Sequence, residues 1–84
     1  MMLPTIHRNG THPRDLLEGL MQANAALQDA IRAVAASGPN GRDYYPQSPG
    51  AIHAAIAEHE SRLQRLQAVR DELNTIAEHV ADHV

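Results

Sequence analysis

The fold is decided by a loop that reads Asn40-Gly41-Arg42-Asp43-Tyr44-Tyr45-Pro46-Gln47, with Ser48-Pro49-Gly50 closing it. This stretch breaks an otherwise helical sequence in two and holds both aromatic residues of the chain. Gly38 and Pro39 end the preceding helix, and the short connection places the next helix antiparallel beside it. The sequence therefore predicts an all-α antiparallel two-helix hairpin.

The first helix is expected from about residue 13 to 37. Thr11 offers a side-chain oxygen as its N-cap, Pro13 is tolerated in its first turn, and Gly38 suits a left-handed C-terminal position. Its apolar seam, in alternating steps of three and four, is Leu17, Leu20, Asn24, Leu27, Ile31 and Val34. This is a coiled-coil spacing, and Leu16, Ala23 and Ala30 widen the seam toward that of a multi-helix bundle. Asn24 either fixes the register of the bundle or lies at a solvated end.

The second helix is expected from about residue 49 to 82, with Ser48 as its cap and Pro49 in its first turn. Its seam includes His59, interpreted as a packed histidine, and Glu58 and Arg62 form an i, i+4 pair. This helix is longer than the first by roughly two turns. A hairpin would then leave the end of the second helix uncovered, unless the N-terminal segment or another subunit covers it.

Residues 1–12 lack a helical pattern and predict an extended N-terminal arm, with a turn at Asn9-Gly10. The domain organisation is thus an arm at 1–12 and a hairpin at 13–84, whose loop spans residues 38–48.

Composition indicates that the hairpin self-associates. The chain has 84 residues, no Phe, Trp or Cys, and 43% apolar residues, among which Ala is the most frequent. So small a domain buries only about 60% of its unfolded surface, and partner subunits supply the missing stability. We therefore expect a homo-oligomer assembled as a helical bundle.

Charge and hydropathy exclude several partners. The net charge of −3 with no dominating basic face argues against bulk nucleic acid. No apolar run approaches the ~20 residues that cross a bilayer, and the first residues lack the features of a signal peptide. The expected partners therefore include no membrane, and the expected location is the cytoplasm of a bacterial host.

No catalytic signature or cofactor motif is present, so we expect a protein that is not an enzyme and has no cofactor. His79 and His83 lie one helical turn apart, but Val80 stands where a zinc protease has its general base. We expect no metal site; assembly through a metal at these histidines is a third, less favoured hypothesis.

The loop is the better candidate for binding. Arg42 offers a fork for phosphate, Tyr44 or Tyr45 a stacking face, and Asn40 hydrogen bonds. The start of the first helix adds a second group, His7, Asn9 and Thr11, at a natural anion position. The two groups lie at opposite ends of a hairpin and meet only if subunits pack head to tail. Alternatively, the tyrosines plug the hairpin end and Arg42 pairs with Asp43 or a helix carboxylate.

The opening Leu3-Pro4-Thr5-Ile6-His7-Arg8-Asn9-Gly10-Thr11 and the loop Asn40–Gln47 together resemble a family of small phage and prophage helical-hairpin proteins. The design also looks like the oligomeric helical sponges with which phages sequester immune signals. That likeness implies ligand pockets at subunit interfaces, with aromatic stacking and arginine–phosphate contacts.

The leading hypothesis is a phage-encoded anti-defence protein that sequesters a cyclic nucleotide or a cyclic ADP-ribose type signal at subunit interfaces. Its ligand-binding residues would be Arg42, Tyr44, Tyr45, Asn40, Asn9, Thr11 and His7. The alternative is an oligomeric protein-interaction or structural module that uses Tyr44 and Tyr45 as a partner-binding hot spot.

Overall fold

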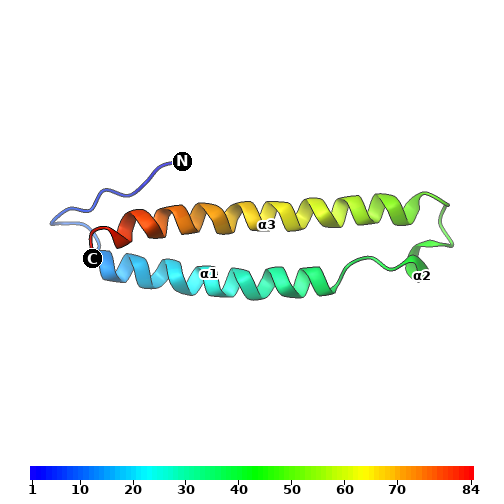
Figure 1. Ribbon diagram of the computed structural model, residues 1–84, viewed down its shortest axis with the longest axis horizontal. Helices are drawn as coiled ribbons and strands as arrows, with labels where there is room; N and C mark the ends of the chain where they lie inside the picture. The colour runs from blue at the N-terminus through cyan, green and yellow to red at the C-terminus, as the bar shows by residue number, and fades with distance from the viewer.

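A computed structural model describes all residues, 1–84, as an antiparallel helical hairpin (Figure 1). It contains three helices, α1 (Pro13–Ala36), α2 (Gly41–Tyr44) and α3 (Ala51–Ala81). The long helices α1 and α3 pack against each other along a molecule of 61 × 21 × 16 Å. The expected all-α hairpin is confirmed.

The residues that cap the two ends of α1 differ from those predicted from the sequence. His12, rather than Thr11, is the N-cap, and its Nδ1 accepts a hydrogen bond from the Arg14 amide at 3.1 Å. At the other end, the Ser37 amide and hydroxyl both donate to the carbonyls of Ala33 and Val34. Because Ser37 already satisfies these carbonyls, no left-handed glycine is needed, and Gly38 has no positive φ. The expected left-handed Gly38 is therefore wrong.

The loop contains a short helix, and α3 begins later than predicted. Asn40 is extended and caps α2, with its Oδ1 accepting from the Arg42 amide at 2.9 Å. Ser48 does not cap α3; its backbone carbonyl instead accepts from the Ala51 amide at 3.2 Å in a turn. Gly50 precedes α3 without a side-chain cap, so the helix starts two residues after the predicted Pro49.

Two polar pairs fix how the long helices align. The Asn24 amide donates to Asn74 Oδ1, and Arg70 donates to Gln28 Oε1 at 3.2 Å. Gly38 lies opposite His59, whose Nε2 would be 3.5 Å from a Cβ added at Gly38. The start of α1 therefore faces the end of α3, and the excess length of α3 lies at its beginning.

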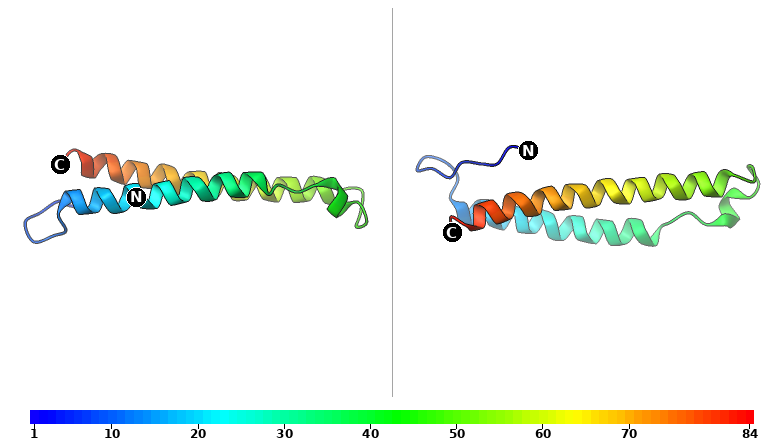
Figure 2. Two further views of the ribbon diagram at one scale, coloured as in Figure 1. Left: turned by 90° about the horizontal axis from the view of Figure 1, so that it is seen from below. Right: turned by 45° about the horizontal axis from the view of Figure 1, so that its top comes forward.

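This alignment corrects the expectation that the end of the second helix is uncovered. Val80, one turn before the C-terminus, is fully buried. The first turns of α3 extend past α1 instead, and the connection with α2 runs alongside them (Figures 1 and 2). The connection is longer than a tight turn, which is why the mismatch in length falls at the loop end.

The N-terminal arm folds back near the C-terminal part of α3 (Figure 1). A turn closes when the Gly10 amide donates to the His7 carbonyl at 3.1 Å. A Cβ at Gly10 would lie 2.9 Å from His7 Nε2, at the far end of a side chain that can rotate away. His79 Nε2 lies 2.7 Å from the Pro4 carbonyl oxygen, and this hydrogen bond ties the arm to its own chain.

The hairpin buries very little of itself. Only Ile31, Ala55 and Val80 are buried. The accessible surface is 6188 Å², whereas a compact folded monomer of 9.2 kDa exposes about 4,900 Å². The radius of gyration is 18.5 Å, against about 12 Å for a compact domain of this length. A single chain therefore has no core of the usual size.

Candidate functional site

The loop presents Arg42 in a defined position. Asn40 Oδ1 accepts from the Arg42 backbone amide and, at 3.2 Å, from its Nε. These two hydrogen bonds orient the guanidinium of Arg42, which lies in the first turn of α2. The three ion pairs of the chain join Arg32 to Asp29, Arg62 to Glu58 and Arg70 to Asp71. Arg42 is in none of them, so its terminal nitrogens are free to bind an anion.

The two tyrosines have different environments. Tyr44 is half-buried at the end of α2, whereas Tyr45 is 80% exposed. The alternative in which both rings plug the hairpin end therefore describes Tyr44 better than Tyr45. The pairing of Arg42 with Asp43 is not formed. An exposed aromatic ring and an unpaired arginine thus lie in one short segment, as a stacking and phosphate-binding surface requires.

The predicted residues of the arm lie at the other end of the molecule. His7, Asn9 and Thr11 are exposed in or beside the arm turn. The long axis of the hairpin separates this turn from α2 (Figure 2). Within one chain the structure therefore does not bring the two groups of predicted residues together.

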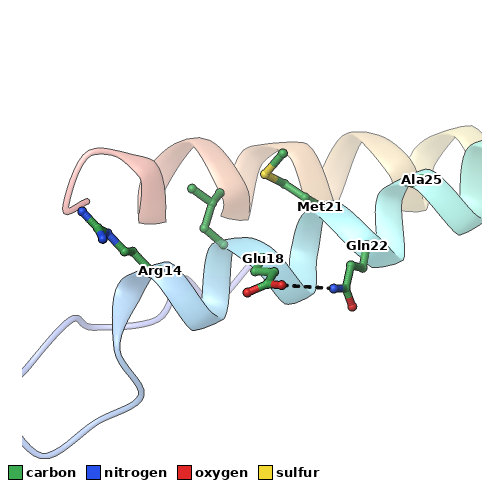
Figure 3. Close-up of a pocket in the computed structure, with 6 residues that line it drawn as sticks. Arg14, Glu18, Met21, Gln22 and Ala25 are labelled. Carbon is green, nitrogen blue, oxygen red and sulfur yellow. Dashed lines mark hydrogen bonds between the residues drawn. The ribbon is translucent and has the colours of Figure 1, made fainter.

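The surface has two depressions, and neither contains a predicted ligand residue. One, of about 420 Å³, lies on α1 and is lined by Arg14, Leu17, Glu18, Met21, Gln22 and Ala25. Figure 3 shows that Glu18 and Gln22 are joined by a hydrogen bond there. This depression has no aromatic side chain and a single basic one, which makes it a poor nucleotide site.

The second depression, of about 300 Å³, is a groove between the long helices lined by Val34, Arg62, Arg65, Leu66 and Val69. The sequence analysis did not predict this groove, in which apolar side chains lie beside two arginines. The predicted pair of Glu58 and Arg62 is present at 3.7 Å. The spacing of Arg62, Leu66 and Val69 along one stripe of α3 is the signal that could have identified this groove.

The histidines at the C-terminus have structural contacts. His79 bonds the arm, and its ring meets that of His83 edge to face with centroids 5.4 Å apart. No three His, Cys, Asp or Glu side chains are grouped so as to hold a metal ion. His59 is half-buried, and its Nε2 is enclosed without a hydrogen-bond partner.

The chain is thus an extended, all-α antiparallel hairpin with an exposed tyrosine and an unpaired arginine in its loop. No family model, curated protein or solved structure matches the chain. None of its helices is both long enough and apolar enough to span a membrane.

Proposed function

We propose that this chain is a self-associating, non-catalytic binding protein that captures a small anionic nucleotide-type ligand at the contact between subunits. The proposal extends to a phage counter-defence role, in which the ligand is a cyclic nucleotide or a cyclic ADP-ribose type immune signal. The observation that carries it is Arg42, which is exposed, oriented by Asn40 and unpaired, in the same loop as the exposed ring of Tyr45.

Self-association is supported by the area that one chain leaves exposed. The surface exceeds that of a compact monomer by roughly 1,300 Å². A standard protein interface takes about 800 Å² from each partner. The excess is therefore sufficient for one interface of standard size and part of another.

The division of roles follows from residue chemistry. The Arg42 guanidinium would donate two parallel hydrogen bonds to phosphate oxygens. Tyr45 would stack against a base, with Tyr44 supporting the loop and Asn40 holding Arg42 in place. His7, Asn9 and Thr11 of a neighbouring subunit would add hydrogen bonds.

Native mass spectrometry with a panel of cyclic nucleotides and cyclic ADP-ribose isomers tests this function. We expect a discrete oligomer that gains ligand mass in a fixed ratio to its subunits. Arg42→Ala should reduce capture at least tenfold, as expected when a charge-assisted contact worth about 1.5–3 kcal/mol is lost. Arg32→Ala, which removes an exposed arginine of α1, is the matched control and should capture normally. Unchanged affinity in Arg42→Ala would reject the assignment.

A second candidate function is a protein-interaction module, and the 80% exposure of Tyr45 specifically favours it. Tyr and Arg are enriched at the energetic centres of protein interfaces, and no cavity surrounds the loop. A wild-type oligomer that captures no member of the panel would favour this candidate. A variant with Tyr44→Ala and Tyr45→Ala should then lose a protein partner while keeping its oligomeric size.

A further inference from the structure

One face of α1 carries only small or apolar residues and is not covered by α3. Its members follow the coiled-coil steps of three and four and are Leu16, Gly19, Ala23, Ala26, Ala30 and Ala33. All except the half-buried Leu16 are exposed, and nothing lies within 4 Å of a Cβ added at Gly19. We call these six residues the small-residue face.

The charged side chains of α1 avoid this face. At 100° per residue, Arg14 and Arg32 lie about 150° around the helix from the centre of this face, and Glu18 and Asp29 lie about 90–110° from it. Asp15 lies at the edge of the face, in the first turn. A solvated helix surface usually carries charged residues. Small residues let another helix approach closely, so this face is suited to a helix–helix contact.

The face continues into the groove between the helices. Val34, one turn after Ala30, lies in the wall of this groove, and Val69, at 45% exposure, lies across from it on α3. The apolar surface therefore extends from α1 onto α3. A partner seated on it would cover part of the roughly 1,300 Å² that the chain exposes beyond a compact monomer.

The members of the small-residue face are separated by the same intervals of three and four residues whether α1 is read from its N-terminus or from its C-terminus. If two copies of α1 overlap fully and run antiparallel, residue 13 of one faces residue 36 of the other. Ala23 then faces Ala26, Gly19 faces Ala30, and the one large residue, Leu16, faces Ala33. A two-fold axis between Ala23 and Ala26 thus matches the face to itself, which is the requirement for an isologous dimer.

We infer that a second copy of this chain packs on the small-residue face, with the two α1 helices antiparallel and fully overlapped. This arrangement places the arm turn of one subunit beside the α2 loop of its partner at each end of the dimer. His7, Asn9 and Thr11 of one chain then join Asn40, Arg42 and Tyr45 of the other. The inference deepens the proposed function, because it names the subunit contact at which that function places the ligand.

Single-cysteine variants test this arrangement cleanly, since the chain has no cysteine of its own. Under mild oxidation with copper–phenanthroline, Ala26→Cys should form an intermolecular disulfide because it lies next to the two-fold axis. Ala25→Cys, which lies about 100° around the same helix from Ala26 and outside the small-residue face, is the control and should crosslink at least tenfold less. A mixture of Gly19→Cys and Ala30→Cys should give the mixed dimer, whereas parallel helices would crosslink Gly19→Cys to itself.

A charge on the face gives an independent measurement. Ala23→Glu should shift the mass in sedimentation equilibrium to that of a monomer or a smaller oligomer, while Ala25→Glu should keep the wild-type mass. Circular dichroism checks that both variants retain their helices.

The outcomes separate this inference from the proposed function. Equal crosslinking of Ala25→Cys and Ala26→Cys, or an unchanged mass for Ala23→Glu, would overturn the antiparallel α1 contact while leaving ligand capture intact. An oligomer that shows the expected crosslinks but captures none of the nucleotide panel would reject the function and keep the interface. A monomeric wild type would overturn the inference outright.

Discussion

At the scale of single residues, Asn24 shows how one polar group sets the alignment of two helices. Its amide nitrogen donates to Asn74 Oδ1 across the hairpin, while its own oxygen is enclosed without a partner. Arg70 and Gln28 form a second polar contact one turn further along α1. Because a polar group in an apolar seam must find a partner, these contacts select one register over neighbouring ones.

Removal of one partner should therefore destabilise the hairpin. Asn74→Ala removes the acceptor of the half-buried Asn24 amide, and we expect a loss of about 0.5–1.5 kcal/mol in the free energy of unfolding because this hydrogen bond is accessible to water. A second substitution, Asn24→Leu, should restore stability because the seam becomes apolar. Urea titrations at one fixed protein concentration measure the free energy of unfolding of the single and the double variant. An Asn74→Ala variant within about 0.3 kcal/mol of wild type would show that this pair does not stabilise the fold.

The chemistry of the loop residues was predictable, but their environment was not. The residue types at Asn40, Arg42 and Tyr45 already indicated stacking and anion binding. The sequence did not indicate that Asn40 would orient Arg42, or that Tyr44 and Tyr45 would differ in exposure, because both follow from the unpredicted helix α2. The cap at His12 was missed because Thr11 is the more common capping residue type.

At the scale of elements, the arm and the end of α3 form one unit. The hydrogen bond from His79 to the Pro4 carbonyl fixes the arm over the part of α3 where Val80 is buried. The helices themselves were predicted to within one or two residues, because their periodicity and the prolines around the loop define them. The sequence analysis named the arm as one possible cover for the end of the second helix, but it could not choose between the arm and another subunit, because the sequence does not specify which carbonyl a histidine of α3 will contact.

The arm should be released when this contact is removed. His79→Ala takes away one hydrogen bond worth about 1 kcal/mol, so we expect trypsin cleavage after Arg8 to become about fivefold faster. His53→Ala, at the exposed opposite end of α3, is the control and should leave the rate unchanged. An arm that is cleaved equally fast in wild type and His79→Ala would mean that the contact does not hold it.

At the scale of the whole molecule, the hairpin has a small core for a single chain. Three buried residues and an extent of 61 Å do not make a core that stabilises 84 residues alone. The shortage of large apolar residues indicated this from composition. The surface that we propose for self-association becomes evident only when the alignment of α1 and α3 shows which side of α1 is uncovered.

Association also decides whether the two predicted groups of binding residues can act together. They are separated within a chain, and the antiparallel dimer that we infer brings them to the same end of the assembly. In the arrangement that we propose, stability, assembly and ligand binding therefore depend on the same contact.

The measurement that tests self-association most directly is sedimentation equilibrium of the wild-type protein across micromolar concentrations. We predict a mass of at least twice the 9.2 kDa of one chain, with dissociation and unfolding coupled on dilution. A stable, fully helical species of 9.2 kDa at every concentration would contradict the account.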